Sequence, residues 1–135
     1  MRVVLDANVV FAGVGWRGEA HHCLLAMAKR RITVFATAEI LEEIRALTVA
    51  RGGKFKHPTN TLLAWYYDRV KRVEPAPLGK QRSRDAKDDP YLACALAAGA
   101  KIIVTRDEDL LALQTPFGIQ IITPRELLTE LAKTF

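Results

Sequence analysis

The chain has 135 residues and a mass of 15.0 kDa, and 50% of its residues are hydrophobic, so we expect one domain over residues 1–135 with a buried core. Lysine and arginine outnumber aspartate and glutamate by 20 to 15, and the resulting charge of +5 at pH 7 suits a polyanionic partner. No apolar run is long enough to cross a bilayer, which excludes a membrane-spanning protein. Cys23 and Cys94 both lie in apolar helical contexts and are expected to be buried thiols, which favours the cytoplasm.

The first predicted elements alternate between strands and helices. A β-branched run over residues 2–5 ends at Asp6 and predicts a buried parallel strand. Apolar residues at intervals of three and four then predict a helix over residues 19–30, and ITVFA at 32–36 predicts a second strand. Thr37 is a suitable N-cap for the helix that follows.

The middle of the chain is less regular. Residues 51–54 (RGGK) interrupt the preceding helix, and Pro58 opens another. A short third strand is expected over residues 70–73. Residues 74–87 contain two prolines, a glycine and several charges with almost nothing apolar, so we expect an exposed loop that is long enough to have a function.

Regular alternation returns in the last third of the chain. Asp89 and Pro90 predict the N-cap and first turn of a helix that Gly99 ends. Four further elements are expected: a strand at 101–105, a short helix at 107–113, a strand at 119–122 and a terminal helix opened by the capping box TPRE at 123–126. This order predicts an α/β fold, a three-layer α/β/α sandwich with a mainly parallel central sheet.

Four carboxylates lie at or near the predicted strand ends. Asp6 ends the first strand, and Asp107 lies two residues beyond Thr105, where a later strand ends. Glu43 lies about two turns into the helix after the second strand, and Asp88 stands at the start of another helix. Because ligands of open parallel sheets bind outside the carboxyl ends of the strands, we expect these four side chains to meet in one cleft.

Such a cluster needs compensation, because neighbouring carboxylates raise one another's pKa unless they bind cations. Mg²⁺ or Mn²⁺ prefers oxygen ligands and can activate water against a phosphodiester, so the pattern indicates metal-dependent hydrolysis. A lone buried carboxylate at Asp6 has few structural explanations, whereas Asp107 could also cap a short helix.

Two of the assignments have close competitors in the sequence. Glu43 stands beside Glu42, and an exposed helical glutamate is usually only solvated. Asp88 competes with Asp85 and Asp89, but N-capping accounts for Asp89, which makes Asp88 the better ligand candidate.

The basic residues also suggest a nucleic-acid contact, although charge alone favours an ordinary solvated face. The candidates for phosphate contacts are Lys80, Arg82, Arg84 and Lys87. Contacts of this kind make binding fall steeply with salt. Aromatic residues at 65–67 and Phe55 could stack on bases, but their helical spacing favours packing in the core or at a dimer surface.

Four segments carry a resemblance to a known family: VVLDANVV at 3–10, EILEEIRAL at 39–47, DAKDDPYLACALAAGA at 85–100 and IIVTRDEDLL at 102–111. Through them the chain resembles, over essentially its whole length, the PIN-domain family, and within it the VapC-like ribonuclease toxins of bacterial and archaeal toxin–antitoxin systems. The resemblance implies a PIN-like fold and an endoribonuclease that cuts RNA. It also implies Mg²⁺ or Mn²⁺ as cofactor, a homodimer, and an antitoxin protein that covers the cleft.

The resemblance also implies roles for single residues. The family's acidic quartet falls on Asp6, Glu43, Asp88 and Asp107. Glu43 is chosen because it precedes the apolar residue of the EEI step, and Asp88 because it stands seven residues before Ala95. Asn8 and Thr105 match polar positions that line such a site, and Asp109 is expected to assist through water.

Two other functions fit parts of this pattern. A phosphatase of the haloacid-dehalogenase type also has an aspartate after its first strand, but Asp6-Ala7-Asn8 lacks the second aspartate that this chemistry needs. A catalytically silent RNA- or protein-binding module with the same fold remains the alternative, and metal-dependent cleavage of RNA would separate it from an enzyme.

Overall fold

A computed structural model of the chain describes residues 1–54 and 60–133. Its strands form one sheet in the order β3-β2-β1-β4-β5, and every pairing is parallel. The strands are β1 (Arg2–Leu5), β2 (Thr33–Ala36), β3 (Lys71–Arg72), β4 (Ile102–Val104) and β5 (Gln120–Ile122). The prediction of a parallel sheet is therefore confirmed; β1 has its predicted bounds, and the other four strands are shorter than predicted.

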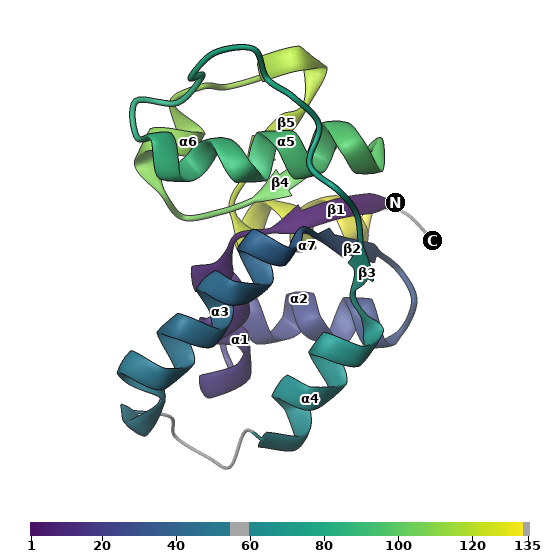
Figure 1. Ribbon diagram of the computed structural model, residues 1–135. Helices are drawn as coiled ribbons and strands as arrows, with labels where there is room; N and C mark the ends of the chain where they lie inside the picture. Colours follow the sequence, from purple (N-terminus) through teal and green to yellow (C-terminus); the bar gives the residue numbers. More distant parts are fainter. Residues whose placement is uncertain (55–59, 134–135) are drawn as a thin grey trace.

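Helices cover the sheet on both sides. They are α1 (Ala7–Gly15), α2 (Glu19–Ala28), α3 (Ala38–Arg51), α4 (Asn60–Arg69), α5 (Asp89–Ala98), α6 (Glu108–Leu111) and α7 (Pro124–Ala132), with 3-10 turns η1 (Gly52–Lys54), η2 (Ala86–Asp88) and η3 (Pro116–Gly118). Figure 1 shows α5 on one side of the sheet and α1 to α4 on the other, which confirms the three-layer α/β/α architecture. No helix among the described residues has the length and apolar character that a bilayer span requires.

Local signals set most of the helix ends. The Thr37 hydroxyl accepts a hydrogen bond from the Ile40 N–H at the start of α3, and Thr123 and Glu126 form the expected reciprocal capping box of α7. Gly99 ends α5 with a φ of 63°, the left-handed conformation that favours glycine. Pro58, the predicted start of α4, lies outside the described residues.

The prediction that Asp89 caps α5 is wrong. Asp88 occupies the N-cap position without making a side-chain cap bond, and Asp89 is the first helical residue. The Asp89 carboxylate instead accepts the backbone N–H groups of Arg82 (2.9 Å) and Ser83 (2.7 Å). It thereby ties the preceding loop to the start of the helix, a long-range role that local capping rules do not contain.

Helix α1 was not predicted. Its sequence ANVVFAGVG is apolar around the whole helix, with two glycines and several β-branched residues, so it has neither an amphipathic period nor a high helix propensity. Burial between α2 and α3 stabilises it nevertheless. A Cβ at Gly13 would lie 2.8 Å from the Ala20 carbonyl oxygen, so this glycine allows α1 to approach α2 closely.

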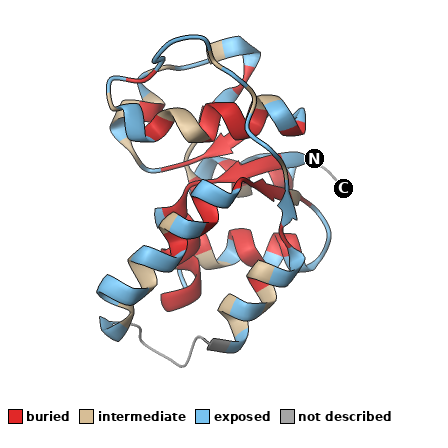
Figure 2. Ribbon diagram, in the orientation of Figure 1, coloured by how far each residue is buried: buried red, intermediate tan, exposed pale blue. Residues whose placement is uncertain are grey.

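The core lies on both faces of the central strands (Figure 2). Val3, Val4, Ile103 and Val104 are completely buried. Tyr66 is buried as well, as expected from its helical spacing, whereas Phe55 lies outside the described residues. The loop at 74–87 is largely exposed as predicted, but Ser83 within it is buried.

Candidate active site

The candidate site lies where β1 and β4 end side by side. Connections leave this point toward opposite edges of the sheet, the position at which open parallel sheets bind ligands. Leu5 pairs with Val104, so the next residues, Asp6 and Thr105, are neighbours as well. The Thr105 hydroxyl donates a 2.6 Å hydrogen bond to Asp6 Oδ2, and the short distance is typical of a charge-assisted bond.

Asp6 also has a structural role. Only 3% of its surface is exposed, and its Oδ1 accepts the Asn8 N–H at 3.1 Å as the N-cap of α1. Asn8 contributes this backbone group, while the residue itself is exposed. The carboxylate of Asp6 is therefore fixed from two directions, by the start of α1 and by Thr105.

Asp107 is tied to the same threonine. Its N–H donates to Thr105 Oγ1 at 2.9 Å, so one hydroxyl donates to Asp6 and accepts from the backbone of Asp107. The Asp107 carboxylate caps α6 by accepting the Asp109 N–H at 2.8 Å. The capping role considered from the sequence is thus present, and it orients Asp107 beside the end of β4.

Glu43 reaches the site through a tyrosine that sequence reasoning missed. The buried Tyr91 hydroxyl donates to Glu43 Oε1 at 2.7 Å and accepts the Ala7 N–H at 3.2 Å. Burial raises the pKa of Glu43, the Tyr91 hydrogen bond opposes this rise, and the charge of Asp6 adds to it. The adjacent Glu42 is exposed and pairs with Arg45.

Among these acids, Asp88 has the largest shift in pKa. Burial raises its pKa to about 7, and the neighbouring charges of Asp107, Asp85 and Asp6 contribute to the rise. Only 5% of its surface is exposed, and the Ser83 hydroxyl donates to its Oδ2 at 3.4 Å. Asp88 therefore retains a proton in a large fraction of molecules near neutral pH.

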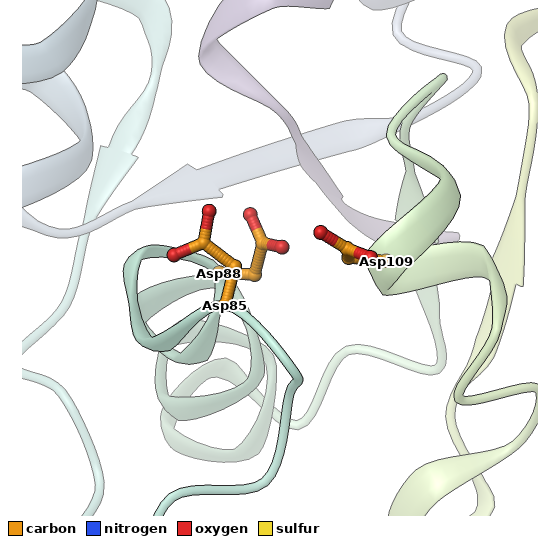
Figure 3. Close-up of side chains that lie close together, drawn as sticks. All are labelled: Asp85, Asp88 and Asp109. Carbon is orange, nitrogen blue, oxygen red and sulfur yellow. The ribbon is translucent and has the colours of Figure 1, made fainter.

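A tighter acidic group surrounds Asp88. Asp85, Asp88 and Asp109 each offer a carboxylate oxygen within 4.8 Å of the others, and Figure 3 shows Asp85 and Asp88 at η2 facing Asp109 on α6. Arg84 pairs with Asp109 at 2.9 Å and offsets part of this negative charge. The sequence singled out Asp109 as a supporting residue and Asp85 only as a competitor of Asp88, because the fold, not the spacing, brings α6 beside η2.

The charges of the four predicted acids therefore influence one another, but the four carboxylates do not form one tight ligand group. Asp6 influences both Glu43 and Asp88, and Asp107 influences Asp88. None of the ion pairs formed within residues 1–54 and 60–133 neutralises any of these four carboxylates. Oxygen donors with this excess of negative charge fit a hard divalent cation.

The predicted phosphate-contact residues border this acidic group. All four of these residues, Lys80, Arg82, Arg84 and Lys87, are exposed. Arg84 is paired with Asp109, and Lys87 lies near enough to lower the pKa of Glu43 slightly. A hollow of about 440 Å³ lies beside Glu43 and Lys87, along the solvent side of α3.

The comparison with protein families decides the identity of this arrangement. The family model described as PIN domain matches residues 2–109, which include β1 to β4 and every acid discussed above. The chain belongs to the PIN-domain family. PIN domains are generally metal-dependent nucleases, so the acidic cluster of this PIN domain has the composition that its family requires.

Solved structures support the fold of this PIN domain. The crystal structure of PAE2754 from Pyrobaculum aerophilum matches with a TM-score of 0.67 and 19% sequence identity, covering 99% of this chain and 91% of that chain. Among curated proteins, none matches the sequence.

Proposed function

We propose that this PIN domain is a Mg²⁺- or Mn²⁺-dependent endoribonuclease that hydrolyses RNA phosphodiester bonds. The observation that carries the proposal is the set of acids at the β1–β4 switch point, of which Asp88 has a pKa raised to about 7 in the absence of a cation. Asp6, Glu43, Asp88 and Asp107 are the proposed catalytic and metal-holding residues, with Asn8, Thr105 and Asp109 in support. Asp85 joins them because of its position beside Asp88 and Asp109.

The side chains around these acids orient them for this task. The Thr105 hydroxyl donates a hydrogen bond to one oxygen of Asp6 and orients this carboxylate, and the Tyr91 hydroxyl orients Glu43 in the same way. Asp88 releases its proton when a cation is bound, because ligand carboxylates must be ionised. The bound cation would supply Lewis-acid activation of a water and stabilisation of the leaving oxygen.

Substitution of Asp6 by asparagine tests the enzyme. In Asp6→Asn the amide oxygen can still accept the Asn8 N–H and the amide nitrogen can donate to Thr105 Oγ1, so the fold should persist, but the lost charge should lower cleavage of RNA at least about 100-fold. Cleavage of a labelled RNA with Mn²⁺ or Mg²⁺ and with EDTA is the measurement, and thermal unfolding reports the fold. Glu42→Gln is the matched control, since Glu42 is exposed and pairs outward with Arg45. If the wild-type chain folds and binds RNA but never cuts it, the catalytically silent binding module is the correct function.

We further propose that the ribonuclease is the toxin of a type II toxin–antitoxin pair, acts in the cytoplasm as a homodimer, and is held inactive by an antitoxin protein. The motifs quoted above support this through their similarity to VapC-like toxins. Induced expression without the partner should arrest growth, and Asp6→Asn should relieve the arrest. Normal growth beside clear RNA cleavage by the purified protein would remove the toxin role and leave the nuclease.

A further inference from the structure

Phe117 is an aromatic residue that folding alone does not explain. It lies in η3 between α6 and β5 with a φ of 54°, a left-handed conformation that is unfavourable for a residue with a side chain. Its surface is nevertheless 48% exposed, so the strained backbone directs the ring to solvent and not into the core. The other exposed large hydrophobic residues in the described part of the chain are Met1, Leu25 and Val49, none of which is aromatic.

Arg82 lies over this ring. Its guanidinium carbon is 5.0 Å from the centroid of the Phe117 ring, within the range of a cation–π contact. Two further hydrogen bonds fix the arginine. Its backbone N–H donates to Asp89 Oδ2 at 2.9 Å, and its side-chain Nη2 donates to the Leu78 carbonyl at 3.1 Å. The aromatic ring and the guanidinium are therefore held together before any ligand arrives.

Both members of this pair are joined to the acidic centre by short stretches of chain. Ser83, the residue after Arg82, donates to Asp88, and Arg84 pairs with Asp109. Asp109 in turn belongs to α6, the helix that precedes the turn of Phe117. Segments 82–84 and 109–117 are therefore in contact at two points, through the Arg84–Asp109 ion pair and through the Arg82–Phe117 pair.

We propose that Phe117 and Arg82 form a stacking site for an unpaired base of single-stranded RNA, beside the phosphodiester that the acids hold. The proposal rests on the proposed ribonuclease function and adds a base-binding subsite to it. Aromatic rings and guanidinium planes stack on any base, and Arg82 adds a positive charge near the RNA backbone. Bases inside an A-form duplex are already stacked and paired, so a duplex cannot offer one to Phe117.

Binding of RNA that lacks single bases tests this site. The probes are a fluorescent single-stranded oligonucleotide and a series in which one nucleotide at a time is abasic, measured by anisotropy with Asp6→Asn protein to prevent cleavage. Removal of one particular base should weaken binding by about 5- to 100-fold, the range that stacking of one base supplies. Phe117→Ala should weaken binding of the intact strand by the same factor and should abolish the effect of that abasic position.

Four further measurements distinguish the loss of base stacking from a general disturbance of the fold. Phe117→Tyr should bind like the parent because it keeps the ring, and Val49→Ala, an exposed apolar residue on α3, should change nothing. The salt dependence of binding should be the same in Phe117→Ala, because no charge is removed. An RNA duplex should bind more weakly than the single strand and should be insensitive to Phe117→Ala.

The outcomes separate this proposal from the one on which it rests. If wild-type protein cuts RNA but Phe117→Ala and its parent bind every abasic probe alike, the stacking site is wrong and the ribonuclease stands. Tighter binding of the duplex than of the single strand would also overturn the site. If the wild-type protein neither binds nor cuts RNA, both proposals fail.

Discussion

The raised pKa of Asp88 predicts a pH-dependent metal site. In the folded chain this carboxyl titrates near 7, whereas its ordinary pKa is 3.8, so the folded state binds the proton more tightly than the unfolded state does. Stability from this group is fully present below about pH 3.8 and is lost as the pH rises through 7. A cation must displace the same proton, so Mg²⁺ affinity should fall by up to about tenfold per unit as the pH drops below 7.

Calorimetric titration with Mg²⁺ between pH 5.5 and 8, in buffers of different ionisation enthalpy, measures both the affinity and the protons released. The contribution of Asp88 should also make the metal-free protein unfold at a higher temperature at pH 5.5 than at pH 8. An affinity that stays constant over this range would contradict the assignment of Asp88 as a ligand.

Tyr91 predicts a second effect of a single side chain. Tyr91→Phe removes the donor to Glu43, in a partly buried bond, and the acceptor for the Ala7 N–H, in a buried one. We expect a loss of about 1–3 kcal/mol in the free energy of unfolding and a 10- to 100-fold loss in metal affinity. Chemical denaturation and metal titration measure the two effects. Tyr67→Phe is the control, since its hydroxyl bonds to the Leu41 carbonyl away from the acids.

The site residues differ in how far a sequence can indicate them. Asp6 and Thr105 follow directly from the ends of two strands, and the fold pairs them as neighbours. In the sequence, Tyr91 has the pattern of an apolar helical residue, and only the fold, which brings its hydroxyl beside Glu43 and the Ala7 N–H, reveals these bonds. Asp85 could not be chosen from spacing because its position beside Asp109 depends on two loops.

The packing of α1 on α2 predicts a position that tolerates no side chain. In Gly13→Ala the new Cβ would approach the Ala20 carbonyl oxygen to 2.8 Å and Leu24 Cδ1 to 2.9 Å. Because the nearest atom belongs to the backbone, the two helices must separate, and we expect a loss of about 1–3 kcal/mol in the free energy of unfolding. Urea denaturation is the measurement. Gly53→Ala is the matched control because its Cβ would meet nothing within 4 Å, and equal stability of both variants would contradict the prediction.

Strands and capped helices were predictable because their signals are local. The apolar runs of β1 and β4 and the capping box of α7 each lie within a few residues of sequence. Helix α1 was missed because its stability comes from burial on all sides, which no short pattern expresses. The role of Asp89 was misassigned for the related reason that its partners lie six and seven residues earlier in a loop.

The distribution of charge over the whole molecule predicts the salt dependence of RNA binding. Lys80, Arg82, Arg84 and Lys87 border the carboxyl edge of the sheet near the acids, whereas Lys29 and Arg30 precede β2 at the opposite edge. In the double variant Arg82→Gln/Arg84→Gln, the slope of log affinity against log salt should flatten by about 1.4, or about 0.7 per lost contact. Binding to single-stranded RNA from 50 to 300 mM salt is the measurement.

The double variant Lys29→Gln/Arg30→Gln removes the same charge from the opposite edge and should leave this slope unchanged. Equal slopes in the wild-type chain and in Arg82→Gln/Arg84→Gln would remove the 80–87 loop from the path of the RNA.

The central position of β1 in the sheet bears on the protein while it is still being made. β1 leaves the ribosome well before one of its two neighbours in the sheet, β4, which begins only at Ile102. A nascent chain that ends before β4 has Asp6 without its Thr105 partner and lacks Asp107 altogether. If the chain cleaves RNA as proposed, its complete acidic site can therefore form only after β4 and Asp107 have left the ribosome.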